Sequence, residues 1–407
     1  MENDSLKKII SHCKAFGFVF QSSEIYDGLS AVYDYGPLGS ELKNNLKSYW
    51  WKTMVHLEKD IVGLDSAIFM DSKTWEASGH VDAFNDPLID NKDSKKRYRA
   101  DVLVEEYLLK IESKINKEIS KGKKRFGESF DENEFKSTNP RVLKYSKKHK
   151  EISNILGELL SSSDLKGLAE LINELEINDP ISGTSNWTDV KQFNLMFSTE
   201  VGSNTENTKK LYLRPETAQG IFVNFLNVTN STRSKIPFGI AQIGKAFRNE
   251  IIARQFIFRM REFEQMEMQF FVKPGTELDW YERWKERRLK WHESLGLGND
   301  LYRFHDHQNL AHYANAACDI EFKFPMGFKE LEGIHSRTDF DLKKHQEKSK
   351  KKMLYFDQKS GESYVPYVVE TSIGLDRLFL SVLATSYKEE ALADGSNRTF
   401  LKIPFEI

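Results

Sequence analysis

Four arginines lie between two strand-like segments in the middle of the chain. The segments read IAQIGKAF and EQMEMQFFV, and the residues between them include Arg248, Arg254, Arg259 and Arg261. The planar fork of an arginine side chain contacts two oxygens at once, so arginine is well suited to phosphate. Four of them in one hairpin predict a site for an anionic ligand, and surface ion pairs are the simpler alternative.

The second segment can be divided by the two-residue period of a β-strand. One set of alternate positions is mostly apolar and contains Glu264, Met266, Met268 and Phe270. The other set is mostly polar and contains Arg261, Phe263, Gln265, Glu267 and Gln269. We expect the first face to pack on a core and the second to form the floor of the site, where Phe263 can stack on a planar ring.

A second cluster is LYLRPETAQGIF, residues 211–222. Pro215 biases Arg214 towards an extended conformation, and the following TAQG indicates the start of a helix. Glu216 could complement the dipole of that helix, and from the residues alone this structural role is favoured over ligand binding.

A third cluster is VVETSIGLDRLFLSVLA, residues 368–384, in which a strand-like run leads into a helix opened by Gly374. Arg377 falls in the first turn, where a cation is unfavourable against the helix dipole unless an anion lies nearby. Glu330 and Glu370 are candidate ligands for a hard cation that a polyphosphate would bring. The histidines at 305, 307 and 312 have no thiolate partners, so zinc is not favoured.

These segments belong to a chain of 407 residues, enough for two or three domains. Its 59 Lys and Arg balance 61 Asp and Glu, so the composition gives no sign of a nucleic-acid partner. The two cysteines cannot form a disulfide framework, which favours a reducing, cytoplasmic compartment. The N-terminus does not resemble a signal peptide, and the apolar runs are far shorter than the ~20 residues that span a bilayer, so no membrane association is expected.

We predict four parts along the chain. Residues 1–99 are globular and contain a turn at DYGPLG, followed by a helix capped by Ser40. Residues 100–185 are rich in Lys and Glu and predict a helical insertion; a solvated appendage without a ligand is an equally good interpretation. Residues 186–395 read as short strands and helices with the candidate site, and residues 396–407 end in the strand-like KIPFEI.

Taken in order, these segments closely resemble the motifs of class II aminoacyl-tRNA synthetases. The amino-acid sequences of the motifs resemble those of glycyl-tRNA synthetases of the α2 homodimer type. The matching phrases are YDYGPLGSELKNN, WEASGH, YRAD, LRPETAQGIF, FRNE, FRMREFEQMEMQFF, LAHY, KELEGI, SRTDFDL and ETSIGLDR. The resemblance implies an α+β fold, with an antiparallel catalytic sheet flanked by helices and a charged helical insertion. It also implies a homodimer formed through Pro37 and the helix after it, and residues 396–407 as the start of an anticodon-binding domain that is otherwise absent.

The resemblance further implies a reaction in which glycine and ATP give glycyl-adenylate and pyrophosphate, after which glycyl is transferred to the 3′ end of tRNA-Gly. The catalytic residues would be Arg248 and Arg377. The ATP-binding residues would be Arg248, Asn249, Glu250, Phe258, Arg259, Arg261, Glu262, Phe263, Glu330, Leu331, Gly374, Leu375, Asp376 and Arg377. The glycine-binding residues would be Arg99, Glu216, Phe263, Glu264, Gln265, Met266, Glu267, Glu370, Thr371, Ser372, Ile373 and Gly374. Mg²⁺ would lie near Glu330 and Glu370.

Thr371 and Ile373 depart from the usual motif, which more often has proline and a smaller residue there. Two other functions remain open. A synthetase-like paralogue could bind a ligand or RNA without charging it, and the lysine-rich segments could make the chain mainly an RNA-binding module. All the implied ATP-contacting positions are retained, which favours the enzyme.

Overall fold

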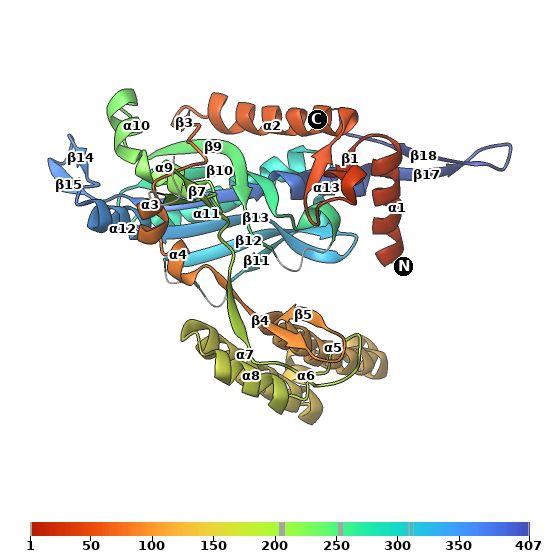
Figure 1. Cartoon of the computed structure of the whole chain (residues 1–407). Coiled ribbons are helices and arrows are strands. Elements are labelled where there is room, and N and C mark those ends of the chain that lie inside the picture. Colours follow the sequence, from red (N-terminus) through yellow and green to blue (C-terminus); the bar gives the residue numbers. More distant parts are fainter. Residues whose placement is uncertain (1, 203–207, 251–254, 308–309, 312, 406) are drawn as a thin grey trace. The chain divides into compact units, whose positions relative to one another are not determined.

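The computed structural model of the chain describes residues 2–202, 208–250, 255–307, 310–311, 313–405 and 407 (Figure 1). The chain divides into two compact units. Unit 1 contains residues 1–84 and 195–407, and unit 2 contains residues 85–194.

Unit 1 is built on a seven-stranded sheet in the order β11-β12-β13-β16-β10-β9-β3. All neighbouring strands are antiparallel except β3 and β9, which are parallel. The strands of the sheet are β3 (Ile61–Gly63), β9 (Phe238–Phe247), β10 (Glu262–Val272), β11 (Tyr302–Asp306), β12 (Ala316–Phe324), β13 (Gly327–Thr338) and β16 (Tyr367–Gly374). The expected antiparallel sheet flanked by helices, and with it the α+β class, is therefore confirmed, with one parallel edge strand.

Four hairpins complete the strands of unit 1. They are β1 (Val19–Gln21) with β2 (Tyr33–Tyr35), β7 (Ser198–Val201) with β8 (Lys209–Tyr212), β14 (Tyr355–Asp357) with β15 (Glu362–Tyr364), and β17 (Tyr387–Ala391) with β18 (Asn397–Leu401). The last hairpin includes part of the segment expected to begin another domain. In the structure Leu401, Ile403 and Ile407 pack against the main core of unit 1, so this segment belongs to the same compact unit.

The helices of unit 1 are α1 (Glu2–Ala15), α2 (Pro37–Trp51), α3 (Ser72–Ala77), α4 (His80–Ala83), α9 (Ala218–Val223), α10 (Phe225–Thr232), α11 (Glu277–Ser294), α12 (Phe340–Ser349) and α13 (Leu375–Ser386). Helix α11 packs on β13 and β16, and α13 packs on β10 and α2. No helix in the described part of the chain is both long and apolar enough to cross a membrane.

Helix α2 begins three residues before the predicted cap. Pro37 occupies its first turn, where the missing N–H costs no hydrogen bond and the fixed φ already suits a helix. The hydroxyl of Ser40 donates to Pro37 O at 3.0 Å and does not cap the helix. Leu42, Leu46 and Trp50 then recur at helical spacing and are buried.

Unit 2 consists of a small sheet and four helices. Its strands, in the order β5-β4-β6, are β4 (Asn85–Asn91), β5 (Lys96–Arg99) and β6 (Lys191–Asn194). Its helices are α5 (Ala100–Phe126), α6 (Glu132–Thr138), α7 (Pro140–Ser161) and α8 (Leu165–Glu174). Unit 2 extends beyond the predicted residues 100–185 at both ends, because the high content of charged residues that indicated the insertion is confined to the helices. The strands that begin and end it have ordinary composition and pair Asn85 with Asn194.

Candidate active site

The polar face of strand β10 lies beside strand β16 in the middle of the sheet. The register pairs Gln269 with Glu370 and Glu267 with Ser372. On the other side of β16, strand β13 pairs His335 with Glu370. Because side chains of directly paired residues project from the same face, these groups gather in one place. Met266, Met268 and Phe270 are buried on the opposite face, as the two-residue period predicts.

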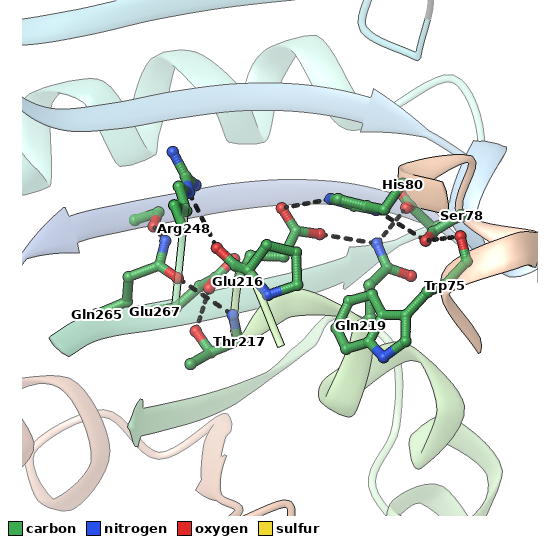
Figure 2. Close-up of polar contacts among 12 residues, drawn as sticks. Trp75, Ser78, His80, Glu216, Thr217, Gln219, Arg248, Gln265 and Glu267 are labelled. Atoms are coloured by element: carbon green, nitrogen blue, oxygen red, sulfur yellow. Dashed lines mark hydrogen bonds and ion pairs between the residues drawn. The ribbon is translucent and has the colours of Figure 1, made fainter. Parts of the chain in front are cut away.

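Three carboxylates meet on this face, and two of them, Glu267 and Glu370, are buried. The first, Glu216, is partly buried (Figure 2). It lies in the turn before α9, 3.6 Å from His80 Nε2, and accepts a hydrogen bond of 2.9 Å from Gln219 Nε2. Burial alone would raise the pKa of Glu216, but His80, Arg337 and Gln219 together hold it well below its usual range. Glu216 is therefore ionised, and its role as a simple helix-dipole partner is replaced by a place in this cluster.

The second carboxylate, Glu370, is held by three side chains. It accepts hydrogen bonds from Arg337 Nη1 at 3.0 Å and Gln269 Nε2 at 2.6 Å, and lies 2.9 Å from His335 Nδ1. Burial raises its pKa, but the charge of Arg337 and the contact with His335 overcome this and lower it to about 2. Glu370 is thus a fixed negative charge.

The third carboxylate, Glu267, is different. It accepts hydrogen bonds from the Thr217 hydroxyl and from Gln269 Nε2, the latter at 2.8 Å. Burial, together with the charges of Glu370 and Glu216, raises its pKa well above the usual value. Glu267 is therefore the carboxylate of this cluster that favours its protonated form, and a small cationic ligand such as an ammonium would allow it to ionise.

Arg248 lies next to the carboxylates at the end of β9. Its Nε donates to Pro215 O at 3.0 Å (Figure 2). Its guanidinium lies 5.3 Å from the ring centre of Phe263 and 5.4 Å from that of Phe84. Cation–π contacts of this kind hold the guanidinium flat, with its Nη groups available to an anion.

Arg377 lies in the first turn of α13, as predicted. It donates from Nη1 to Glu330 O at 3.0 Å, lies 2.9 Å from Glu330 Oε2, and its guanidinium is 4.4 Å from the Phe258 ring centre. Arg377 lowers the pKa of Glu330. The anion that the sequence pattern required beside Arg377 is therefore supplied, within this chain, by Glu330.

Comparison with known proteins identifies both parts of the chain. Residues 86–195 match the family described as glycyl-tRNA synthetase insertion domain 1, and residues 197–386 match the class II core domain of the G, H, P, S and T tRNA synthetases. The glycine–tRNA ligase of Chlorobaculum tepidum is 49% identical over 98% of this chain and 79% of its own length. That of Macrococcus caseolyticus is 48% identical over 99% and 78%, respectively. The chain belongs to the glycine–tRNA ligase family.

Several residues that the family resemblance assigned to the site lie elsewhere. Glu264, Met266, Thr371 and Ile373 occupy the alternate positions of β10 and β16, and Met266 and Ile373 are part of the hydrophobic core. Glu264 pairs instead with Lys43 at 2.8 Å. The physical reason is the two-residue period, which places neighbours in a strand on opposite faces.

Other assigned residues have structural partners. Leu331 and Leu375 are buried in the core, Asp376 accepts from Lys43 Nζ at 2.7 Å, and Glu262 pairs with Lys245 at 2.6 Å. In the segment after β9, Arg261 donates from Nε to Glu250 O at 2.9 Å, and Asn249 N donates to Leu195 O at 2.8 Å.

Arg259 and Gly374 were also assigned to the site. Arg259 is half-buried, and Gly374 is the N-terminal cap of α13. Arg254 and His312 lie outside the described residues.

Arg99, expected near the glycine carboxylate, belongs to unit 2. There it pairs with Asp101 at 2.5 Å and with Asp86 at 3.1 Å. The sequence patterns did not indicate three further residues of this cluster, His80, His335 and Arg337. His80 and Arg337 stand in the phrases WEASGH and SRTDFDL, so a signal was present, but no spacing rule connects them to Glu216 and Glu370.

Proposed function

We propose that this chain activates glycine with ATP to form glycyl-adenylate and pyrophosphate, and then transfers glycyl to the 3′ end of tRNA-Gly. The observation that carries the proposal is the cluster of three carboxylates, two of them buried, beside Arg248, in a chain of the glycine–tRNA ligase family. The cluster suits an ammonium, and Arg248 suits the carboxylate and phosphate that react with each other.

In this proposal the glycine ammonium lies among Glu216, Glu267 and Glu370. Because glycine has no side chain, selection must rest on its charged ends and on the exclusion of bulk. Negative charge accumulates on the α-phosphate during activation, and Arg248 would stabilise it as a preorganised cation. Phe263, beneath Arg248, would offer its ring to adenine once the guanidinium turns towards phosphate.

Mg²⁺ would accompany ATP, and the two assigned ligands fit it unequally. Glu330 has a side chain that is about half exposed and forms an ion pair with Arg377. Glu370 has its oxygens occupied by Arg337, His335 and Gln269. We therefore propose Glu330, and not Glu370, as a carboxylate that would contact the metal, with the phosphates supplying further oxygens. Arg377 would then be released to the terminal phosphates.

The test is ATP–pyrophosphate exchange measured with each amino acid in the presence of Mg²⁺. We expect exchange with glycine alone, and its loss by at least a hundredfold in Arg248→Ala, since a preorganised contact to developing charge is worth about that much. No exchange with any amino acid would exclude the proposal and favour a paralogue that binds without charging.

We also propose that the chain works as a homodimer in the cytoplasm. Large apolar side chains near the start of α2 are exposed in the single chain: Ile25 is 88%, Tyr26 80% and Leu38 51% exposed. Large exposed apolar side chains are typical of an interface where they form a contiguous patch. Light scattering should give twice the chain mass, and Ile25→Asp with Tyr26→Asp should reduce it to that of one chain. A cytoplasmic location is supported by the two cysteines, Cys13 and Cys318, which are free and buried.

For unit 2 we propose contact with the tRNA acceptor stem. Residues 110–150 carry 13 Lys and Arg against 6 Asp and Glu, whereas residues 151–190 carry one against eight. Helices α5 and α7 pack together, so most of the first group lies on one pair of helices. Deletion of the unit should raise the Michaelis constant for tRNA and leave glycine-dependent exchange intact.

A further inference from the structure

A cavity of about 520 Å³ lies in unit 1 between the end of α10 and the hairpin β14–β15. Its walls come from two short stretches of chain, residues 229–230 with 233–236 and residues 355–359. A hydrogen bond of 3.3 Å from Ile236 N to the Tyr355 hydroxyl joins the two stretches. None of these residues takes part in the glycine or ATP site described above.

The cavity is lined by three cations, Arg233, Lys235 and Lys359. Within the part of the chain that the structure describes, none of the three has an ion-pair partner. The acidic residue in the lining, Asp357, is already engaged inside the hairpin: it accepts from Lys359 N at 2.9 Å and from the Ser360 hydroxyl at 3.1 Å. The lining therefore keeps a net positive charge, with three cations against one carboxylate, and this favours an anionic ligand.

An aromatic ring stands beside these cations. Tyr355 and Phe356 are neighbours in β14, so their side chains point to opposite faces. Tyr355 packs against the core, and Phe356 is left 57% exposed. A cationic lining with an exposed ring is the combination with which proteins bind a nucleotide of a single strand, since the cations contact the phosphate and the ring stacks on the base.

Positive charge continues along the chain from this cavity. Lys350, Lys351 and Lys352 follow α12 directly, shortly before β14 begins, and the described residues provide no ion-pair partner for them either. A free nucleotide would need only the cavity, whereas neighbouring phosphates of a strand would also use these lysines. The arrangement therefore fits RNA better than a free nucleotide.

We propose that this cavity binds one nucleotide of a tRNA strand, with its phosphate on Arg233, Lys235 and Lys359 and its base on Phe356. The flanking phosphates lie against Lys350, Lys351 and Lys352. The proposal rests on the proposed function, because it takes tRNA as the partner, and it adds a contact site outside both the catalytic residues and unit 2.

The experiment measures binding of a labelled tRNA-Gly transcript to the full chain by fluorescence anisotropy, at several salt concentrations. Arg233→Ala/Lys235→Ala/Lys359→Ala should bind more weakly and lower the slope of log affinity against log salt by about 0.7, the value for one lost phosphate contact, because the three cations share one phosphate. Phe356→Ala should weaken binding roughly fivefold to a hundredfold with the slope unchanged. Both variants should retain glycine-dependent exchange.

The matched control is Lys290→Ala/Lys323→Ala/Lys388→Ala, which removes three exposed lysines of unit 1 far along the chain from the cavity; its affinity and slope should stay nearer to those of the unaltered chain. If the triple cavity variant loses exchange, it has misfolded and its tRNA affinity is not informative. The single change Lys359→Glu, at an exposed position, is then used instead: it should weaken tRNA binding and retain exchange. The proposal is overturned if the cavity variants bind tRNA with the affinity of the unaltered chain. It is also overturned if adenosine monophosphate or inorganic phosphate binds in the cavity, whereas the cavity variants leave the affinity for tRNA unaffected. Absence of exchange in the unaltered chain would overturn the proposed function instead.

Discussion

The carboxylate end and the arginine end of the candidate site are organised differently. Glu370 is buried, Glu216 is partly buried, and each is fixed by several side chains, so their positions do not depend on a ligand. Arg248 and Arg377 rest on aromatic rings and pair with groups that a nucleotide can replace, a backbone oxygen and Glu330. The contrast suggests that the amino-acid end is rigid before binding, whereas the ATP end exchanges protein contacts for ligand contacts.

The largest effect should come from removing Arg337, which holds the rigid end together. It donates to Glu370 at 3.0 Å and to Asp341 at 2.8 and 3.1 Å, and all three residues are buried. Arg337→Ala leaves two buried carboxylates without their cation, so we expect the free energy of unfolding to fall by about 3–5 kcal/mol. Urea denaturation measures this. Arg377→Ala, in the half-exposed pair, is the control and should cost less than about 1 kcal/mol.

Glu267→Gln should separate binding from stability. Because the pKa of Glu267 is raised, the free protein holds this group protonated, and glutamine resembles that state in shape and charge. We expect little change in thermal unfolding but a Michaelis constant for glycine raised roughly tenfold to a hundredfold, as for a lost charged hydrogen bond. The constant for ATP should not change. An equal rise for both substrates would contradict a site divided into two ends.

The same group predicts the pH dependence of glycine binding. The pKa of Glu267 is raised in the free protein by burial and by Glu370 and Glu216, and a bound ammonium lowers it because it favours the carboxylate. Binding therefore releases a proton. The affinity for glycine should rise with pH between the pKa of Glu267 in the bound protein and its pKa in the free protein, by at most tenfold per pH unit. Above the pKa in the free protein the affinity should level off. Calorimetry in buffers of different ionisation enthalpy detects the proton, and Glu267→Gln should abolish the rise.

The smallest effect should come from His335, which positions Glu370 from strand β13. With His335→Ala, Arg337 and Gln269 still hold the carboxylate, so we expect the Michaelis constant for glycine to rise only about threefold to tenfold, the value of one hydrogen bond. The turnover number and the constant for ATP should remain near those of the unaltered chain. His335→Asn, which keeps a donor, should recover part of the loss; no recovery would indicate that the histidine acts only through packing.

Local periodicity predicted much of this site. The alternation of β10 gave the polar and apolar faces, and Arg377 was identified by its place in a first helical turn. What local patterns could not predict is pairing over long distances along the chain. Glu216 was interpreted as a helix-dipole partner because His80 lies 136 residues away. The partner of Arg377 was expected to be a phosphate, because the sequence does not indicate that β13 brings Glu330 beside α13.

The limits of unit 2 were missed for a related reason. Its charged helices are obvious in the composition, but β4 and β6 are defined only by pairing with each other. That pairing brings Asn85 and Asn194 side by side, and within unit 1 Leu195 N donates to Phe84 O at 3.0 Å. Composition cannot reveal that the two ends of a long segment meet.

This closure has an evolutionary consequence. Since the chain leaves and re-enters unit 1 at neighbouring residues, a segment of 110 residues occupies the place of a short turn. Such a segment can be lengthened, shortened or exchanged in one genetic event without reconnecting any strand of the catalytic sheet. The two units can therefore change at different rates, and unit 2 can vary while the catalytic sheet stays fixed.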